Sequence, residues 1–261
     1  MDQNLQKIVE SVNYVIPSDY ISGRISEYDI KKANINILLK NNVISEGHYK
    51  YLESLPKYDR EVYIGKMIRS NTYIGECIKF GIIEAKKILF TSNYVNIDEI
   101  IRIANDAVYI NRLDDLYFTK FDNIEFIKKS EWTNFVKLNK SLLLFINING
   151  SSINMDVKGI NNLELHEPLL SVFANVILTL ERSGIDNAIS DLSNFIEDYI
   201  NLQLDVPYYR ELNSFGNFKI KDRNFYISDT SISVNDIDIN YNLNLLRKFM
   251  SILYNLYFSK K

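Results

Sequence analysis

One short stretch, Ile101 to Asn111, most constrains how this chain can fold. Its sequence, IRIANDAVYIN, has two apolar, β-branched runs on either side of the dipeptide Asn105-Asp106. Asn and Asp tolerate the positive φ angles of tight turns, and a two-residue loop is the commonest connection between hairpin strands. The stretch therefore predicts a β-hairpin with the carboxylate of Asp106 at its tip. Taken alone, the stretch is better explained by Asp106 as a simple turn former.

A second aspartate gives Asp106 a candidate partner. Asp29 lies at the end of a predicted strand, Ile25–Ile30, and the pattern turns helical at Ala33–Leu39. This segment therefore predicts a strand-to-helix junction with a carboxylate between the two elements. Two carboxylates presented by separate elements are a possible site for acid–base or metal chemistry.

Composition excludes several classes of protein. No run of 18 apolar residues occurs, so we expect no membrane span. The opening MDQNLQKIVESV lacks the apolar region of a secretory signal. The single cysteine, Cys77, rules out an internal disulfide and a multi-cysteine zinc site, and two histidines, His48 and His166, rule out a histidine-rich metal site. We therefore expect a reducing, cytoplasmic setting.

The charge is unevenly distributed along the chain. The net charge of −3 argues mildly against a protein that wraps nucleic acid along its whole surface. Positive charge nevertheless gathers at 57–69, 86–87 and 128–140, while acidic residues recur in the C-terminal third. We therefore expect an anionic ligand to bind the first 160 residues.

The remaining periodicities predict helices in both halves of the chain and strands between them. Together they indicate a mixed α/β (α+β) fold with one antiparallel sheet. The predicted strands beyond the hairpin are 124–127, 133–138, 142–148 and 153–157, with a strand-prone stretch at 218–227. The predicted helices are 4–16, 46–56, 58–90 with a break near 72–75, 168–181, 188–201 and 243–257.

Three residues recur at helical spacing within the long helical pattern. Lys66, Arg69 and Tyr73 are three and four residues apart, so they share one face of a helix. Such a face could grip a triphosphate and stack a base. The alternative is an ordinary solvated charged face.

The order of these segments resembles the palm of template-dependent DNA polymerases, most nearly the family B type. The strand–aspartate–helix form of GRISEYDIKKANINILLKNNVIS (Gly23–Ser45) is similar to that family's first motif and implies Asp29 as a metal ligand. ANDAVYI resembles the third motif, Asp-Thr-Asp-Ser at a hairpin tip. It keeps the metal-binding second aspartate as Asp106 and has Ala104 in place of the first. The resemblance covers roughly residues 20–165.

Other segments extend the resemblance. KMIRSNTYIG (Lys66–Gly75) is similar to the second motif on the fingers helix, with Ser70-Asn71 transposed and one residue inserted before Gly75. ECIKFGIIEAKKILF matches the helix that follows it in the family. VKLNKSLLLFI and DVKGI (Asp156–Ile160) look like the family's post-palm strands, which implies contacts to primer–template through Lys140 and Lys158.

The resemblance implies an architecture and a chemistry. Residues 1–165 would form a palm with fingers-like helices at about 44–92, and residues 166–261 a helical, thumb-like region. Asp29 and Asp106 would hold two Mg²⁺ (or Mn²⁺) ions about 3.5–4 Å apart, one for the primer 3′-hydroxyl and one for the triphosphate. Lys66, with Arg69 or Arg60, would meet the phosphates, and Tyr73 would pack near the nascent base pair.

The chain also departs from the family. Asn34 stands where the family has the tyrosine that excludes ribose, which makes ribonucleotide use conceivable and includes Asn34 among the nucleotide-binding residues. The tyrosine of the post-palm motif is Leu142, and the 261 residues leave no room for the exonuclease domain. The resemblance thus implies a minimal polymerase, a part of a split one that needs further subunits, or a palm that has lost activity.

Two other interpretations remain open. A non-catalytic, palm-like or unrelated α/β protein could bind partners in a replication or viral assembly, with Asp29 and Asp106 as ordinary cap and turn residues. A nucleotidyltransferase without a template would keep both aspartates but lack a duplex-sized basic groove. Geometry separates the first from the polymerase: carboxylates more than about 8 Å apart cannot share a two-metal site.

Overall fold

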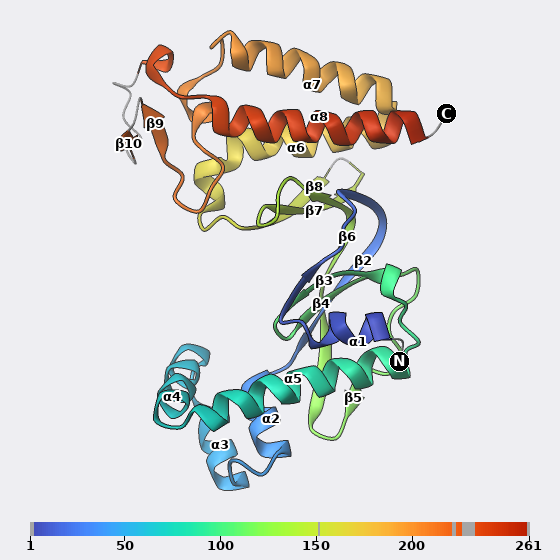
Figure 1. Ribbon diagram of the computed structural model, residues 1–261, viewed down its shortest axis with the longest axis vertical. Coiled ribbons are helices and arrows are strands. Elements are labelled where there is room, and N and C mark those ends of the chain that lie inside the picture. Colours follow the sequence, from blue (N-terminus) through green and yellow to red (C-terminus); the bar gives the residue numbers. More distant parts are fainter. Residues whose placement is uncertain (1–2, 151, 221–222, 226–232, 260–261) are drawn as a thin grey trace. The chain divides into compact units, whose positions relative to one another are not determined.

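The computed structural model describes residues 3–150, 152–220, 223–225 and 233–259. The chain forms two compact units, drawn in Figure 1. Unit 1 comprises Met1–Pro17 and Gly23–Glu131, and unit 2 comprises Ser18–Ser22 and Trp132–Lys261. Strands β2 (Tyr20–Ile30) and β6 (Ile124–Lys137) contribute residues to both units. The sequence predicts a boundary at 165/166 between a palm and a thumb-like region. This position falls within unit 2, and the division stays a prediction.

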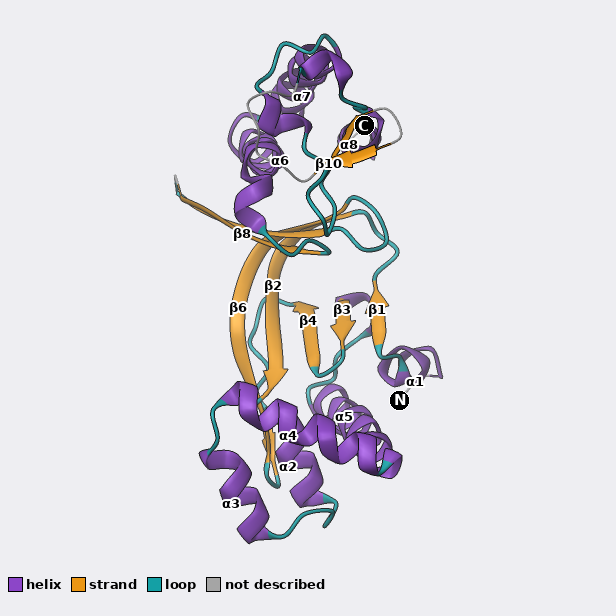
Figure 2. Ribbon diagram, turned by 90° about the vertical axis from the view of Figure 1, so that its left-hand side faces the viewer, coloured by secondary structure: helices purple, strands orange, loops and turns teal. Residues whose placement is uncertain are grey.

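The sheet of unit 1 is antiparallel, with the strand order β1-β3-β4-β2-β6 (Figure 2). The predicted hairpin is confirmed as β3 (Ile100–Ala104) and β4 (Ala107–Asn111), joined by a two-residue turn. Its β-branched residues favour the extended backbone, and Asn105 takes the left-handed conformation, φ 52°, that Asn tolerates. The other strands are β1 (Asn13–Val15) on β3, and the short β5 (Lys120–Phe121) on β6.

Helices α1 (Gln3–Glu10) and α5 (Thr72–Ser92) pack their apolar sides against this sheet. The core that they form with it is mainly aliphatic, with a few aromatic rings, and contains Val9, Leu89, Ile103 and Val108, each fully buried. Helices α2 (Ala33–Lys40), α3 (Glu46–Ser54) and α4 (Lys57–Ser70) enclose a second apolar cluster with the first half of α5. The short 3-10 helix η1 (Ile97–Glu99) leads into β3.

Close contact between α2 and α5 depends on Gly81. A Cβ atom at this position would lie 2.2 Å from Cγ2 of Ile37, far inside van der Waals distance. We expect Gly81→Ala to lower the free energy of unfolding by about 1–2 kcal/mol, because overpacking outweighs the gain in helix propensity. Gly65→Ala on α4 is the control: no described atom lies within 4 Å of its Cβ, and we expect roughly 0.5–1 kcal/mol of stabilisation. Urea denaturation of both variants measures the difference, and equal stabilisation would contradict this packing.

Unit 2 packs three long helices on its part of the sheet. Strands β7 (Leu143–Asn149) and β8 (Ser152–Lys158) continue from β6 in the order β6-β7-β8. Helices α6 (Leu163–Ser183), α7 (Ile185–Ile200) and α8 (Asn240–Ser259) lie side by side (Figure 1) and share one apolar core with these strands. The remaining elements are η2 (Val206–Tyr209), β9 (Phe218–Ile220), β10 (Arg223–Phe225) and η3 (Val234–Asp236).

Among the described residues, α6 alone is long and apolar enough to cross a membrane by length and composition. Core helices also meet these two criteria. Leu169, Phe173 and Ile177 of α6 are buried in the core of unit 2, which accounts for the apolar composition of the helix.

The predicted α+β class with an antiparallel sheet is confirmed, but several predicted elements differ in extent. The helix predicted at 4–16 ends at Glu10, because residues 13–15 pair with β3 as an edge strand. The strands predicted at 124–127 and 133–138 form one strand, β6. Helix α6 begins at Leu163, with Pro168 inside it rather than in its first turn. The strand-prone stretch 218–227 forms β9 and β10, and positions 221–222 and 226–227 lie outside the described residues.

Candidate functional site

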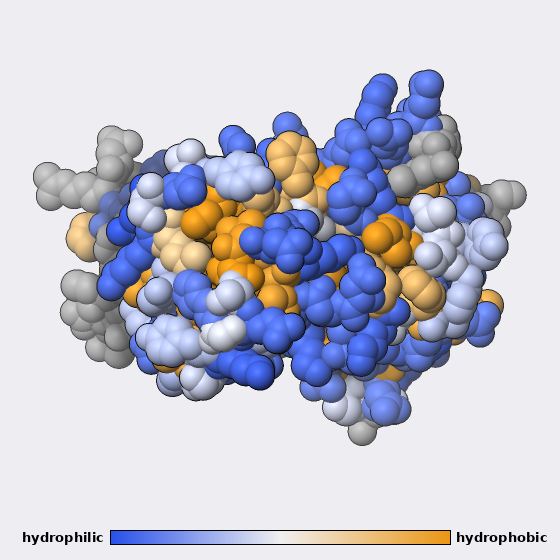
Figure 3. Space-filling view, turned by 90° about the horizontal axis from the view of Figure 1, so that it is seen from below, coloured by the Kyte–Doolittle hydropathy of each residue, from blue (hydrophilic) through white to orange (hydrophobic). Residues whose placement is uncertain are grey.

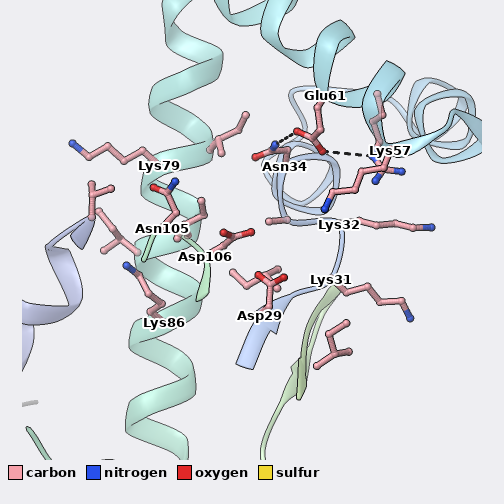
Figure 4. Close-up of a pocket in the computed structure, with 18 of the residues that line it drawn as sticks. Asp29, Lys31, Lys32, Asn34, Lys57, Glu61, Lys79, Lys86, Asn105 and Asp106 are labelled. Carbon is pink, nitrogen blue, oxygen red and sulfur yellow. Dashed lines mark hydrogen bonds and ion pairs between the residues drawn. The ribbon is translucent and has the colours of Figure 1, made fainter. Parts of the chain in front are cut away.

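The sheet of unit 1 brings Asp29 and Asp106 together. In the register between β2 and β4, Asp29 lies opposite Ala107, the residue that follows Asp106. The two carboxyl groups are joined by a hydrogen bond. Both side chains therefore meet where β2 ends and the hairpin turns (Figure 4), close enough for the charge of Asp106 to act on Asp29.

The environment of Asp29 favours its protonated form. Burial and the negative charge of Asp106 raise the pKa of Asp29 from its ordinary value of 3.8 to about 6. The ammonium of Lys129 partly opposes this shift, since its Nζ lies 3.8 Å from Oδ2 of Asp29. Two carboxyls that share a site cannot both ionise easily, and this mutual repulsion is one cause of the raised pKa of Asp29.

A cavity of about 660 Å³ opens over the two aspartates. All of its lining residues belong to unit 1, and they come from the end of β2, from α2, α4 and α5, from the hairpin turn and from β6. Its charged and amide-bearing lining residues are Asp29, Lys31, Lys32, Asn34, Lys57, Arg60, Glu61, Lys79, Lys86, Asn105, Asp106 and Lys129.

Cations outnumber carboxylates around this cavity, and some of them have no carboxylate partner. Lys31 and Lys32 pair with glutamates outside it, at 2.9 Å and 2.7 Å. Lys57 and Lys79, by contrast, form no ion pair within the part of the chain that the structure describes. Arg60 is buried, and its Nε lies 3.8 Å from Glu61. This arrangement suits an anionic ligand with several phosphate oxygens.

A hydrogen-bonded pair of polar side chains lies where α2 and α4 line the cavity. Asn34 donates a hydrogen bond of 2.7 Å to Glu61, which links the start of α2 to α4 (Figure 4). Asn34 comes five residues after Asp29, with the turn at Lys31 and Lys32 between them, and Lys32 has a φ of 48°. This turn directs the first turn of α2 toward the cavity.

The predicted nucleotide-binding residues divide into two groups. Arg60 and Asn34 line the cavity with both aspartates, whereas Lys66, Arg69 and Tyr73 are exposed and are absent from its lining. Lys66 and Arg69 share a solvent-facing side of α4, but Tyr73 belongs to α5, so the predicted single helix face of three residues is wrong. Their predicted role in binding nucleotide remains untested.

Helices α3 and α4 carry aromatic rings that contact one another. Figure 3 shows that the face seen from below is mostly hydrophilic, with apolar side chains gathered near its middle. On α3 and α4 the rings of His48, Tyr51 and Tyr63 contact one another edge to face or tilted, with centroids 5.6–6.3 Å apart. These contacts fix the packing of α3 on α4.

The two predicted nucleic-acid-binding lysines belong to unit 2. Lys140 is exposed in the connection between β6 and β7, and Lys158 ends β8 with its Nζ 2.6 Å from Oδ2 of Asp156. Lys158 lies opposite Leu143, at the start of β7. Both lysines therefore lie at the same end of the β7–β8 pair.

Of the seven cations among the described residues that line the cavity, sequence reasoning named Arg60 as a site residue and missed Lys31, Lys32, Lys57, Lys79, Lys86 and Lys129. Lys79 and Lys86 are seven residues apart on α5, which places them two turns apart on one helix face, in line with the pocket residues Gly75 and Ile82. Lys57 and Lys129 come from the first turn of α4 and from β6. The spacing on α5 was a usable signal, while the positions of Lys57 and Lys129 depend on tertiary structure.

The donor set suits a magnesium or manganese ion that arrives with phosphates. The described residues contain no group of three or more His, Cys, Asp or Glu side chains placed to hold a metal. Magnesium, however, is usually bound through one or two carboxylates, with waters and substrate phosphate oxygens as its other ligands. The adjacent Asp29 and Asp106 supply two such carboxyl groups beside the cations that line the cavity.

Among solved structures, the chain is similar to the family B DNA polymerase of the hyperthermophilic archaeon Pyrobaculum calidifontis, with a TM-score of 0.44 and 11% sequence identity. The similarity covers 91% of this chain and 46% of that polymerase, so the chain spans about half the length of that protein. A search of the curated proteins finds no match.

A family model gives the assignment of the chain itself. The model described as "Bacteriophage PBS1 gene 130 protein" matches residues 3–255, nearly the whole sequence. The chain therefore belongs to the family of the bacteriophage PBS1 gene 130 protein.

Proposed function

We propose that this protein is a template-dependent nucleic-acid polymerase whose reaction centre is the pair Asp29 and Asp106. The observation that carries the proposal is the meeting of these two carboxyls, one from the end of β2 and one from the β3–β4 turn, beneath a cavity lined with cations. Triphosphate oxygens would lie against the cations and the primer end against the aspartates. The alternative, a non-catalytic subunit of a replication or viral assembly, does not require this combination.

The chemistry would be nucleotidyl transfer. The 3′-oxygen of the primer forms a bond to the α-phosphorus, pyrophosphate leaves, and the hydroxyl proton passes to solvent. Magnesium or manganese bound at the two aspartates would stabilise the charge that develops on the reacting oxygens. Asp29 would act as a ligand in its ionised form, which predominates above its pKa of about 6, and Asp106 would present its carboxylate from the hairpin turn. Lys57, Arg60 and Lys79 would hold the phosphates.

The nucleic acid would also contact unit 2. Lys140 and Lys158 at one end of the β7–β8 pair are the candidates for phosphate contacts with primer–template, as phosphate binding by lysines is independent of base sequence. Further polymerase subunits could complete the duplex-binding surface.

Primer extension tests the proposal. Purified protein receives a labelled primer with or without its template, Mg²⁺ or Mn²⁺, and either deoxyribonucleotides or ribonucleotides. We expect extension that requires the template and the metal, and the nucleotide that is used answers the question raised by Asn34. Extension without a template would indicate a terminal nucleotidyltransferase instead. No extension under any of these conditions, alone or with the other replication proteins of its phage, would favour the non-catalytic alternative.

Replacement of single cations tests which of them bind the triphosphate. We expect Arg60→Gln to raise the KM for nucleotide by about tenfold, since charge-assisted hydrogen bonds to phosphate are worth roughly 1.5–3 kcal/mol. Lys66→Gln is the matched control on the same helix, and because Lys66 lies outside the cavity we expect a KM within about twofold of wild type. Steady-state kinetics at saturating primer–template measures both. A larger effect of Lys66→Gln would place the triphosphate outside this cavity.

A further inference from the structure

Lys86 is a buried cation that the proposed reaction does not use. It is 1% exposed, on the face of α5 that lines the cavity, and Figure 4 shows it extending toward the turn at Asn105 and Asp106. Its Nζ donates a hydrogen bond of 3.3 Å to the carbonyl oxygen of Ser11. The next residue, Lys87, forms ion pairs with Glu10 and Glu84.

One long hydrogen bond is little compensation for a buried ammonium. A charge removed from water requires an opposite charge or several hydrogen bonds. Asp106 lines the same cavity as Lys86, and its negative charge favours the protonated amine. Burial lowers the pKa of Lys86 to about 8, so the amine still carries its charge for most of the time at pH 7. The electrostatic partner of Lys86 is therefore the reaction centre.

Above the Asp29 pKa of about 6 both carboxyls are mainly ionised, and the charges at the floor of the cavity then balance without a metal ion. Asp29 and Asp106 provide two carboxyl groups, and Lys129 and Lys86 provide two ammonium groups, one beside Asp29 and one beneath the turn that bears Asp106. A divalent cation at this place makes the floor strongly positive. The negative charge of a triphosphate in the cavity would neutralise this excess positive charge.

We propose that Lys86 is a positioning residue: its ammonium is the internal counter-ion of Asp106 in the metal-free site, and it makes tight divalent-metal binding depend on a triphosphate. This inference rests on the proposed function, since it assigns the two aspartates to a metal site. Without nucleotide, Lys86 repels a metal ion; with nucleotide, it attracts the phosphates. Metal and triphosphate would therefore bind cooperatively, and the coupling is reciprocal.

A purely structural role is the competing explanation. Lys86 holds the carbonyl of Ser11, and the adjacent Val12 carbonyl accepts a hydrogen bond from the amide of Asn105. Lys86 could thus support the hairpin turn through the chain at Ser11. In that case its replacement changes thermal stability and weakens every ligand alike.

Manganese binding separates the two explanations. Free Mn²⁺ is measured by electron paramagnetic resonance at pH 7, with wild type, Lys86→Met, Lys87→Met as the matched control, and Asp106→Asn. Without nucleotide, we expect Lys86→Met to bind Mn²⁺ at least about tenfold more tightly than wild type, because a nearby positive charge is removed from a low-dielectric site. We expect Lys87→Met to bind like wild type and Asp106→Asn to lose the site.

A second titration uses a non-hydrolysable nucleoside triphosphate with Mn²⁺. We expect Lys86→Met to bind this complex about tenfold more weakly than wild type, the opposite direction from Mn²⁺ alone. Lys86→Gln, which keeps a donor for the Ser11 carbonyl, replaces the methionine variant if that one fails to fold. Affinities equal to those of Lys87→Met, or weakened in both titrations, would overturn the role of Lys86 while leaving the metal site intact. Mn²⁺ binding that Asp106→Asn does not affect would overturn the proposed metal site itself.

Discussion

Asp106→Asn is expected to reduce nucleotide incorporation at least about 1000-fold. The substitution keeps the shape of the side chain and the turn but removes the negative charge that holds a divalent cation, a contribution of several kcal/mol to the transition state. Asn is also a good residue for this turn, so the hairpin is retained. Single-turnover primer extension measures the loss, and the melting temperature shows that the fold persists.

Asp114→Asn is the matched control for that experiment. Asp114 is an exposed aspartate shortly after β4 and outside the cavity, so its replacement removes one negative charge without touching the site. We expect activity within about twofold of wild type. Equal losses in the two variants, or an active Asp106→Asn variant, would exclude Asp106 as a metal ligand.

Asp29→Asn is expected to inactivate the protein and yet stabilise it. Asp29 carries a burial and repulsion cost in the folded state, which is why its pKa lies near 6. An amide in its place donates a hydrogen bond to Asp106 without that cost. From the shift, reduced because the side chain is 30% exposed, we expect the metal-free variant to gain about 2 kcal/mol in free energy of unfolding at pH 8.

The stability advantage of Asp29→Asn is expected to depend on pH, and the raised pKa of Asp29 determines the direction of that dependence. A folded-state pKa of about 6 exceeds the unfolded value of 3.8, so the folded state binds the proton more tightly. The contribution of Asp29 to stability is therefore unfavourable above pH 6 and improves as the pH falls toward 3.8. Urea denaturation at pH 8 and pH 5 should show the advantage of Asp29→Asn shrinking at the lower pH by roughly 1 kcal/mol. An advantage that grows at pH 5, or a variant less stable at pH 8, would contradict the raised pKa.

Much of the site's framework was predictable from local sequence. The β-branched runs around Asn105-Asp106 determine a hairpin, and the strand that ends at Asp29 has a clear helical continuation. The two segments can pair, as β2 with β4, once the strands form one antiparallel sheet. What local pattern could not supply is the register that sets Asp29 opposite Ala107, because it depends on long-range strand pairing.

The cations were harder to place. Lys66 and Arg69 have a regular spacing, but spacing alone does not say which face of α4 points inward; the buried residues of that helix are Arg60 and Ile64. On α5, Lys86 and Lys87 are adjacent and chemically identical. Only Lys86 falls within the apolar stripe, four residues after Ile82, and this position distinguishes the fully buried Lys86 from the partly buried Lys87.

The most direct test of the account is a crystal of the protein soaked with Mn²⁺ and a non-hydrolysable nucleoside triphosphate. We predict an anomalous manganese peak within ligand distance of carboxylate oxygens of both Asp29 and Asp106, with triphosphate oxygens beside Lys57, Arg60 and Lys79. A manganese peak elsewhere, or a triphosphate bound outside this cavity while the two aspartates remain hydrogen-bonded to each other, would contradict it.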